Sequence, residues 1–405
     1  MSRFKNLVYF KIIHPLIHQQ GSGQNIKKNL GNEKKIAFYC SSEIYSGTEH
    51  NIFLLIEWLR ERGLNVLLLT SASSLIANEA EKKNIEIVYV EPNIRYFDFK
   101  NARSVARLLR KLKVKILFIG TNRDIDIGSL IKSIFYRKLK LVYLQQMQLE
   151  FSKKDFFHTL RYRQYDAWII PLSYLSEQVK SQTHYNIRKI HVIPFCVDVK
   201  PIQLNPMSQL EARHRLDLPP AARIVGIYGH IEPHKKQDLL IRTAKYLKSH
   251  NFDIDVLIMG IPGSELGNEY YDFLVRMAKD YKLSEKIHFR SFQRDENLFY
   301  RAIDVFAVIT DDEASGMHTI KALANGTPII ALDAGGNKEI LENETLGFLY
   351  RSNDFGDFST KILSLLTNHK ILKYLSEEGM KAALKKYDKS IECNKIEELI
   401  NLLIK

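Results

Sequence analysis

Residues 311–340 read DDEASGMHTIKALANGTPIIALDAGGNKEI, and this stretch decides the fold. The apolar run at 305–309 just before it predicts a buried strand. A turn with Gly316 then opens a helix, a second strand follows at 329–332, and the pair Gly335-Gly336 turns into another helix. Two neighbouring strand-to-helix turns bring backbone N–H groups and helix N-termini into one crevice, which favours phosphate oxygens.

The same stretch resembles the nucleotide-sugar-binding signature of the group 1 glycosyltransferases (glycosyltransferase family 4), which have the GT-B fold. The family pattern is a glutamate, seven residues, Glu-Ala-Met-Ala-x-Gly-x-Pro, an apolar strand and then Gly-Gly-x-x-Glu. The chain matches it at Glu313, Ala322, Ala324, Gly326, Pro328, Gly335, Gly336 and Glu339. At the second glutamate of the pattern this chain has Lys321.

Apolar runs of strand length alternate with amphipathic helical stretches along the chain, which predicts α/β architecture with two Rossmann-like, doubly wound domains. The predicted strands include 35–40, 114–119, 167–170, 255–259 and 329–332, and the predicted helices include 51–63 and 319–324. A Pro-containing, aperiodic segment at 201–206 is the predicted linker. The resemblance implies an acceptor-side domain at 1–200 and a nucleotide-sugar donor domain at 201–388, facing each other across a cleft. It also implies that the helix at 389–405 returns to the first domain.

Charge is distributed unevenly over the 405 residues. The first 200 contain 32 Lys and Arg against 17 Asp and Glu, a net charge of +15. The whole chain has a net charge of +13, so the remaining residues are slightly acidic. Such a basic half suits an anionic membrane surface, but it is also what a solvated basic face looks like, and the sequence leaves both open. We find no nucleic-acid recognition motif. The three scattered cysteines and the lack of a long apolar run predict a cytoplasmic protein, peripheral to the membrane where it meets one.

A second motif, at 229–240, follows a predicted strand and opens a helix. The resemblance implies that Gly229 approaches the donor, and that Lys235 and the residue at 230 hold its diphosphate. The family usually has arginine where this chain has His230. Fixed cations stabilise the charge that grows on a leaving diphosphate without a metal ion. The alternative is a solvated lysine cluster at a helix start, although cations there oppose the helix dipole.

The acidic turn before 319 has a similar double interpretation. By resemblance, Glu313 approaches the hydroxyls of the donor sugar, and Gly316, Met317 and His318 present backbone N–H groups to its phosphates. Glu313 could equally be a first-turn carboxylate that stabilises the helix N-terminus, and His318 could be a solvent-exposed histidine.

Lys321 is the main departure from the family pattern. A glutamate at this position accepts hydrogen bonds from the ribose hydroxyls, whereas a lysine can only donate. Glu339 or Asp333 would then take the ribose, or Lys321 would contact a phosphate or an acidic sugar. The third interpretation is that donor binding has been lost.

On the acceptor side, Ser46, Gly47 and Thr48 stand where the family has a glycine-rich loop, although a single glycine in a turn is usually structural. Gln145 follows a predicted strand where the family often has a histidine near the reacting sugar. An Asp-x-Asp sequence at 124–126 is too short to indicate a metal, and its fold context is wrong, so we expect neither metal nor cofactor.

The expected activity is therefore metal-independent transfer, with retention of configuration, from a nucleoside-diphosphate sugar to a hydroxyl of a glycan or lipid-linked glycan. Retention and metal independence come from the resemblance, as does the link to polysaccharide biosynthesis. Two alternatives remain: a non-catalytic GT-B subunit that has lost donor turnover, and a sugar-nucleotide epimerase of the same fold.

Overall fold

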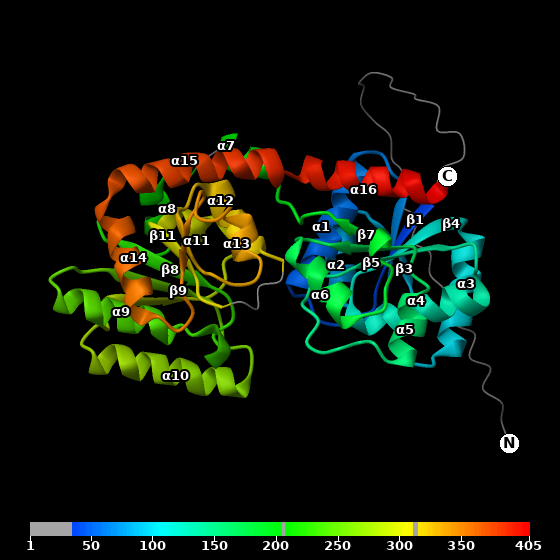
Figure 1. Ribbon diagram of the computed structural model, residues 1–405, viewed down its shortest axis with the longest axis horizontal. Helices are drawn as coiled ribbons and strands as arrows, with labels where there is room; N and C mark the ends of the chain where they lie inside the picture. Colours follow the sequence, from blue (N-terminus) through cyan, green and yellow to red (C-terminus); the bar gives the residue numbers. More distant parts are fainter. Residues whose placement is uncertain (1–34, 95, 205–206, 311–314) are drawn as a thin grey trace. The chain divides into compact units, whose positions relative to one another are not determined.

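The computed structural model describes residues 35–94, 96–204, 207–310 and 315–405. Its contacts divide the chain into unit 1, Met1–Ile193 with Cys393–Lys405, and unit 2, Pro194–Glu392. Each unit contains one parallel sheet with helices on both faces (Figure 1). This confirms the predicted fold class of two Rossmann-like domains.

The sheet of unit 1 has the order β3-β2-β1-β4-β5-β6-β7. Its strands are β1 (Lys35–Cys40), β2 (Val66–Thr70), β3 (Glu86–Tyr89), β4 (Val114–Ile119), β5 (Lys140–Leu144), β6 (Ala167–Ile170) and β7 (Ile190–Val192). The helices are α1 (Gly47–Glu61), α2 (Leu75–Lys82), α3 (Phe99–Lys111), α4 (Ile125–Leu130), α5 (Phe156–Tyr162) and α6 (Tyr174–Gln182).

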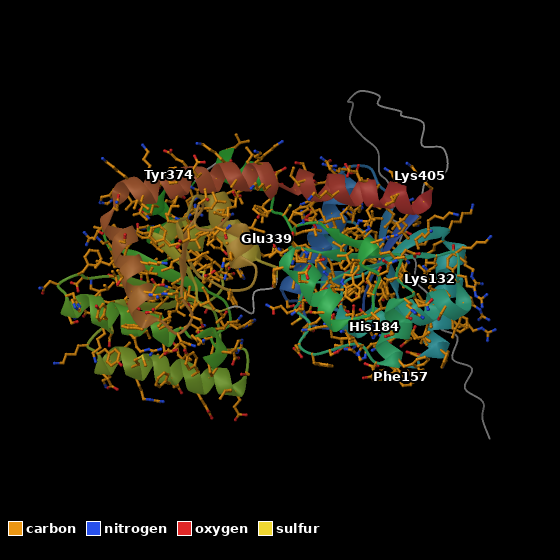
Figure 2. All side chains as sticks on the ribbon, in the orientation of Figure 1. Lys132, Phe157, His184, Glu339, Tyr374 and Lys405 are labelled. Carbon is orange, nitrogen blue, oxygen red and sulfur yellow. The ribbon has the colours of Figure 1, made fainter. Side chains whose placement is uncertain are left out.

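The central strands of unit 1 are apolar along their length because helices cover both faces of the sheet. Helices α3, α4, α5 and α6 pack on one face, where a single core cluster includes Leu109, Ile127, Tyr162 and Val179. In Figure 2 the side chains crowd both faces of this sheet. The chain runs outward from β1 to β3 and then returns to β4, so the β1–β4 junction is the topological switch point of unit 1.

Unit 2 repeats this arrangement with the sheet order β10-β9-β8-β11-β12-β13. Its strands are β8 (Ile224–Tyr228), β9 (Asp255–Met259), β10 (Ile287–Arg290), β11 (Val305–Val308), β12 (Ile329–Leu332) and β13 (Phe348–Tyr350). The helices are α7 (Val199–Leu204), α8 (Gln209–Arg215), α9 (Asp238–Ser249), α10 (Glu265–Asp280), α11 (Asn297–Ala302), α12 (Met317–Asn325), α13 (Asn337–Ile340), α14 (Phe355–Thr367) and α15 (His369–Lys386).

The switch point of unit 2 lies between β8 and β11, because the chain leaves β8 toward β9 and β10 and then returns to β11. Strands β8, β11 and β12 are consecutive neighbours and run parallel. The loops that follow them therefore leave the same edge of the sheet side by side. These loops contain the two sequence motifs.

The predicted linker at 201–206 is wrong for its first four residues, which belong to α7. Val199 of this short helix is buried, and α7 packs against α12 and α15. The Gln203 side chain donates to the Met380 carbonyl at 3.0 Å. The segment looks aperiodic because six residues are too few to show a helical repeat, and packing on two longer helices stabilises it. Residues 205–206 lie outside the described part.

The last helix, α16 (Lys389–Ile404), contributes to both units, since residues from Cys393 onward group with unit 1. There Arg62 of the α1 C-terminus donates to Asn394 at 2.6 Å and to Glu397 at 3.0 Å. Among the helices of the described residues, none is long and apolar enough to cross a membrane.

Glu392 is a buried carboxyl at the end of unit 2, and its Oε2 accepts a hydrogen bond from the Cys196 N–H at 2.9 Å. Burial raises the pKa of Glu392 from 4.5 to about 8. Between these values the folded protein keeps a proton that the unfolded chain releases, so stability falls as pH rises through this window. Each pKa unit of separation corresponds to about 1.4 kcal/mol.

We therefore expect Glu392→Gln to keep the acceptor, to remove the titration and to flatten the fall in unfolding free energy between about pH 5 and 8. Urea unfolding of both proteins at several pH values measures this. Glu398→Gln, an exposed position on the same helix, is the matched control. Parallel pH profiles for wild type and Glu392→Gln would contradict the assignment.

Candidate functional site

The loop after β8 packs directly on the loop after β9. Gly229 has a φ of +139°, and its N–H donates to the Met259 carbonyl at 3.0 Å. A Cβ added to Gly260 would lie 1.9 Å from the Gly229 carbonyl oxygen. A side chain at Gly260 would therefore displace the strand end that presents the Gly229 motif.

Glu232 also fixes the loop after β8. The sequence motif gave no indication of this role. Its carboxylate accepts from the Gly263 N–H at 3.2 Å and from the Ser264 hydroxyl at 2.8 Å. A Cβ at Gly267 would approach Glu232 Oε1 to 2.7 Å. In the sequence, the only indication of this contact is the glycine repeated at 260, 263 and 267, because glycine permits two loops to approach closely.

Gln237 holds the backbone of this loop at His230. The Gln237 side chain is 1% exposed, and its Nε2 donates to the His230 carbonyl at 2.9 Å. Lys235 is half-buried at the end of a short 3₁₀ turn, whereas the next residue, Lys236, is exposed with a left-handed φ of +54°. The His230 ring is exposed and lies edge-on to Phe292 at 5.4 Å between centroids.

The loop after β11 leads into α12 through Gly316, which has a φ of +66°. Its carbonyl accepts from the Ile320 N–H at 2.9 Å, so the helix begins here, two residues earlier than predicted. Met317 is buried. The His318 ring contacts the Tyr300 hydroxyl at 2.8 Å and lies 4.7 Å from the Tyr228 ring, so its side chain belongs to an aromatic cluster. Glu313 lies outside the described residues.

The loop after β12 contains the paired glycines, with Gly335 at a φ of +57°. The helix that follows Gly336 is a single turn that carries Glu339, half-buried. Asp333 pairs with Lys338 at 3.1 Å. A single helical turn has only a weak dipole. An anion at this loop would therefore be bound by backbone N–H groups and not by the electrostatic field of a helix.

Lys321 is paired within unit 2. Its ammonium contacts the Glu296 carboxylate, which precedes α11, and α11 packs against α12. Tyr228 also lies beside Glu296. The pKa of this tyrosine is raised mainly by burial and, to a smaller extent, by the nearby Glu296 carboxylate. The carboxylate absent from position 321 is thus present on the neighbouring helix start, where only tertiary structure reveals it.

In unit 1, the Ser46–Thr48 segment forms the start of α1 rather than a turn ahead of it. The Ser46 N–H and hydroxyl both contact Glu49 Oε2, at 2.9 and 2.6 Å. This interaction at a helix start explains why α1 begins at Gly47, four residues before the predicted start. A Cβ at Gly47 would meet nothing within 4 Å. The protein itself therefore does not require glycine there.

Gln145 is 1% exposed and lies in the core of unit 1. Its Oε1 accepts from the Trp168 indole at 2.8 Å, and its Nε2 donates to the Met147 carbonyl at 2.9 Å. The neighbouring Gln146 joins the α1 start to β4, since its Nε2 donates to the carbonyls of Thr48 and Gly120. The Gln146 amide therefore joins the two loops of the switch point, whereas Gln145 is held against β6.

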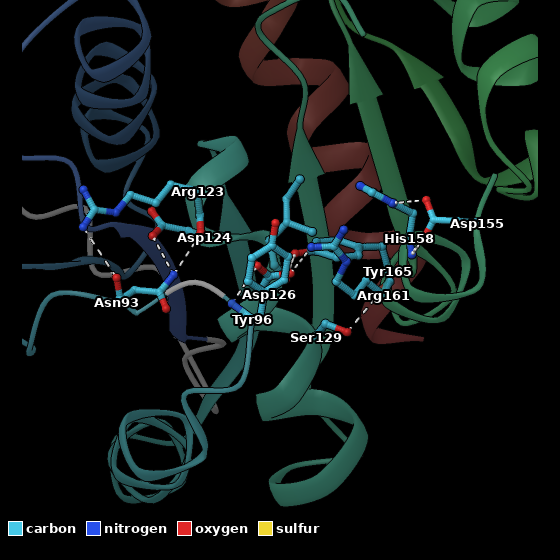
Figure 3. Close-up of polar contacts among 11 residues, drawn as sticks. Asn93, Tyr96, Arg123, Asp124, Asp126, Ser129, Asp155, His158, Arg161 and Tyr165 are labelled. Carbon is cyan, nitrogen blue, oxygen red and sulfur yellow. Dashed lines mark hydrogen bonds and ion pairs between the residues drawn. The ribbon is translucent and has the colours of Figure 1, made fainter. Parts of the chain in front are cut away.

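Asp124 lies at this switch point, and Figure 3 shows it beside Asn93 and Arg123. It is fully buried and accepts from the Ser41 N–H at 3.0 Å and the Thr121 hydroxyl at 2.6 Å, with a longer contact of 3.5 Å from Asn93. Burial raises its pKa, and the hydrogen bonds from Ser41 and Thr121 oppose that shift. Asp126 pairs instead with Arg161. Each aspartate of the Asp-x-Asp sequence is thus engaged by protein groups.

The chain is similar to known proteins in both sequence and fold. Residues 208–382 match the family model described as "Glycosyl transferases group 1". A glycosyltransferase from Rickettsia africae ESF-5 has the same fold, with a TM-score of 0.81 at 17% identity over 93% of this chain and 100% of that one. Anabaena Alr3699/HepE in complex with UDP gives 0.80 at 18% identity, over 91% and 99%. The two-domain fold is therefore the GT-B fold.

Among curated relatives, the D-inositol 3-phosphate glycosyltransferase of Mycobacterium sp. (strain JLS) is 33% identical over 204 residues, which is 50% of this chain and 45% of the relative. The enzyme of the same name from Nocardia farcinica (strain IFM 10152) is 33% identical over 182 residues, 44% and 40%. The chain thus spans less than half the length of these relatives. The match of residues 208–382 to the group 1 glycosyltransferase model confirms the resemblance seen in the motifs.

Asp124→Ala tests the structural role of the buried carboxylate. Its removal leaves the Ser41 N–H and the Thr121 hydroxyl without their acceptor, so we expect the unfolding free energy of unit 1 to drop by roughly 2–4 kcal/mol. Urea unfolding followed by far-UV circular dichroism measures the loss. Glu91→Ala, an exposed carboxylate of the same unit, should change it little, and an equally small effect of Asp124→Ala would rule out this role.

Proposed function

We propose that this protein is a glycosyltransferase that moves a sugar from a nucleoside-diphosphate sugar to a hydroxyl of a glycan or lipid-linked glycan. The observation that supports this best is the switch point of unit 2. Three adjacent parallel strands, β8, β11 and β12, place the Lys235 loop, the α12 start and the paired glycines at one sheet edge. Ligands of open α/β sheets bind in the crevice at this place.

The proposed chemistry is stabilisation of the leaving diphosphate. Lys235 and His230 supply positive or donor groups from the loop after β8, and the first backbone N–H groups of α12 supply a helix N-terminus. Glu313 is proposed to bind the hydroxyls of the donor sugar. Retention of configuration and independence from metal ions are further parts of the proposal, and both rest on the family resemblance.

Uridine diphosphate sugars are the first donors to test. The Anabaena protein with the same fold is described in complexes with UDP and UDP-glucose. Phe292 and Tyr228, 5.2 Å apart, offer aromatic surface beside His230 at this edge. We propose that a pyrimidine base packs on this surface.

We propose that Glu296 replaces the family's second glutamate as acceptor for the ribose hydroxyls. Lys321 contacts its carboxylate, and the side chain of Glu296 keeps 33% of its surface exposed, against 15% for Lys321. The lysine then orients the acceptor and the glutamate faces the ligand. This interpretation keeps a carboxylate at the site despite the reversed charge at 321.

The alternative is a non-catalytic GT-B subunit, and the charge reversal at Lys321 is the observation in its favour. The two proposals differ in an assay of UDP release from a panel of UDP-sugars with a chelator present. Release from any donor, with or without an acceptor, supports the enzyme. No release, together with no stabilisation of the protein by UDP, supports the subunit. We place the protein in the cytoplasm, where nucleotide sugars are available to it.

Lys235→Ala is expected to weaken UDP binding by roughly 10- to 100-fold, because it removes a charged hydrogen bond to phosphate. Lys236→Ala is the matched control, since that lysine is adjacent in sequence but exposed on the left-handed residue of the loop. Isothermal titration calorimetry with UDP measures both. Equal effects of the two substitutions would remove Lys235 from the phosphate site.

A charge swap tests the Glu296–Lys321 pair. Lys321→Glu alone sets two carboxylates against each other, so we expect lower stability of unit 2 and weaker UDP binding. In the double variant Glu296→Lys/Lys321→Glu, the pair is restored in the reverse order, with a glutamate where the family has one. Stability and UDP affinity should then both recover. Recovery of stability without recovery of affinity would show a purely structural pair.

A further inference from the structure

Helix α10 carries an apolar stripe along one side, which the proposed transfer chemistry does not use. We call this set of residues the α10 stripe, and it consists of Leu266, Tyr270, Phe273 and Met277. Leu266 is 58% exposed and Phe273 40%, whereas Tyr270 and Met277 are half-buried. Spacings of four, three and four residues place all four side chains on one side of the helix. A helix side that meets only water normally presents polar residues.

Contacts with the loop after β8 and with α9 fix the position of this stripe. At the start of α10, the Ser264 hydroxyl donates to the Glu232 carboxylate at 2.8 Å. Further along, the Tyr270 hydroxyl donates to Asp238 Oδ1 at 2.8 Å and accepts from the Asp238 N–H at 3.1 Å. The rings of Tyr270 and Phe273 are stacked, with centroids 5.9 Å apart. Figure 1 shows α10 beside α9 at the margin of unit 2.

The charged residues of α10 are ordered along the helix. Its first half contains the acidic residues Glu265, Glu269 and Asp272 and no basic residue. Its second half contains Arg276 and Lys279, with one acidic residue at the last position. This order suits the helix dipole. It also makes the exposed side of α10 complementary in charge to the same side of a second α10 that runs in the opposite direction.

The stripe matches itself in one antiparallel register. When two copies of α10 cross at the middle of the helix, Leu266 of one copy faces Met277 of the other, and Tyr270 faces Phe273. Every apolar residue of the stripe then meets an apolar residue of the second copy. The alternating spacing of four and three residues is the one at which two helices pack side chains into each other.

The charges beside the stripe agree with this register. Glu269 and Arg276 are exposed and lie seven residues apart, so they flank the stripe on the same side. In the antiparallel pair, Glu269 of one copy approaches Arg276 of the other, and two-fold symmetry repeats this ion pair at the opposite end. In a parallel pair in register, the acidic halves of both helices would lie together instead.

We propose that α10 is a homodimer interface, at which two copies of this chain pair antiparallel through the α10 stripe. A two-fold pair uses the same patch of both copies, so each apolar contact and each ion pair occurs twice. The stripe supplies the apolar surface, and the flanking charges select the antiparallel direction. One helix from each copy makes a small interface, so we expect a weak dimer with a Kd on the order of 10–100 µM.

Sedimentation velocity of the full chain tests the proposal. Between about 5 and 200 µM protein, the mean sedimentation coefficient should rise from the monomer toward the dimer value. Leu266→Ser/Phe273→Ser should weaken dimerisation roughly tenfold or more, because each serine removes apolar surface from both copies. The matched control is Leu210→Ser/Leu384→Ser, two apolar residues of unit 2 that are 63% and 43% exposed. The control should dimerise like wild type.

Exchange of the two charges tests the register. Glu269→Arg and Arg276→Glu each place like charges at both ends of the pair, so either variant alone should dimerise roughly tenfold more weakly than wild type. An equal mixture of the two variants brings opposite charges together again and should restore the dimer. Damage to the fold cannot produce this recovery, and far-UV circular dichroism checks each variant. Added salt should weaken the wild-type dimer.

Three results would overturn the proposal. The first is wild-type protein that stays monomeric up to about 200 µM. The second is a dimer that persists unchanged in Leu266→Ser/Phe273→Ser, which would place the interface elsewhere. The third is a mixture of the folded charge variants that stays monomeric, which would contradict the antiparallel register. None of these measurements uses a nucleotide or a donor sugar, so their outcome is independent of the proposed transfer activity.

Discussion

The structure depends on one constraint of doubly wound parallel sheets. In each unit the chain leaves the first strand in one direction and returns on its other side, at β4 in unit 1 and at β11 in unit 2. The loops that follow these two strands diverge, so backbone N–H groups at the sheet edge lack partners from regular secondary structure. An acceptor must be supplied at this point, either by the chain or by a ligand.

The two units meet this requirement differently. In unit 1, the carboxylate of Asp124 enters the switch point and accepts from Ser41 and Thr121, so the chain supplies its own anion. In unit 2, glycines with positive φ at 229, 316 and 335 keep the loops close to the sheet edge, and a lysine and a histidine lie on the first loop. This basic, glycine-lined edge suits an external phosphate. This difference between the units supports the proposed anion site in unit 2.

The sequence was sufficient for the parts of the fold that are local. Strands buried on both faces are continuous apolar runs, and so β1, β4, β6, β9 and β12 were predicted with their observed bounds. The start of α1 was missed because a Ser46–Glu49 interaction, rather than hydrophobic periodicity, sets it. The helix α7 was missed because it is stabilised by packing on α12 and α15. Short elements of this kind carry little signal of their own.

The same distinction applies to the candidate site. Glycine and proline spacing located the three loops, since these residues act through the local backbone. The pairing of Lys321 with Glu296 spans 25 residues and two helices, and no local pattern indicates it. Gln145 illustrates the opposite error: it follows a strand at the functional edge, yet Trp168 from the adjacent strand covers it. A position in sequence gives the sheet edge on which a residue lies, but not whether its side chain faces the ligand or the core.

The basic first half of the chain left two interpretations open, a membrane surface and a solvated face, because net charge alone does not distinguish them. A solvated face gains nothing from exposed phenylalanine, and each exposed ring has a cost in water. In unit 1, exposed phenylalanines lie at the start of the basic helix α3 and on α5. Binding of the full chain to anionic and to neutral vesicles distinguishes the two interpretations, because only a membrane surface would retain the protein on the anionic ones.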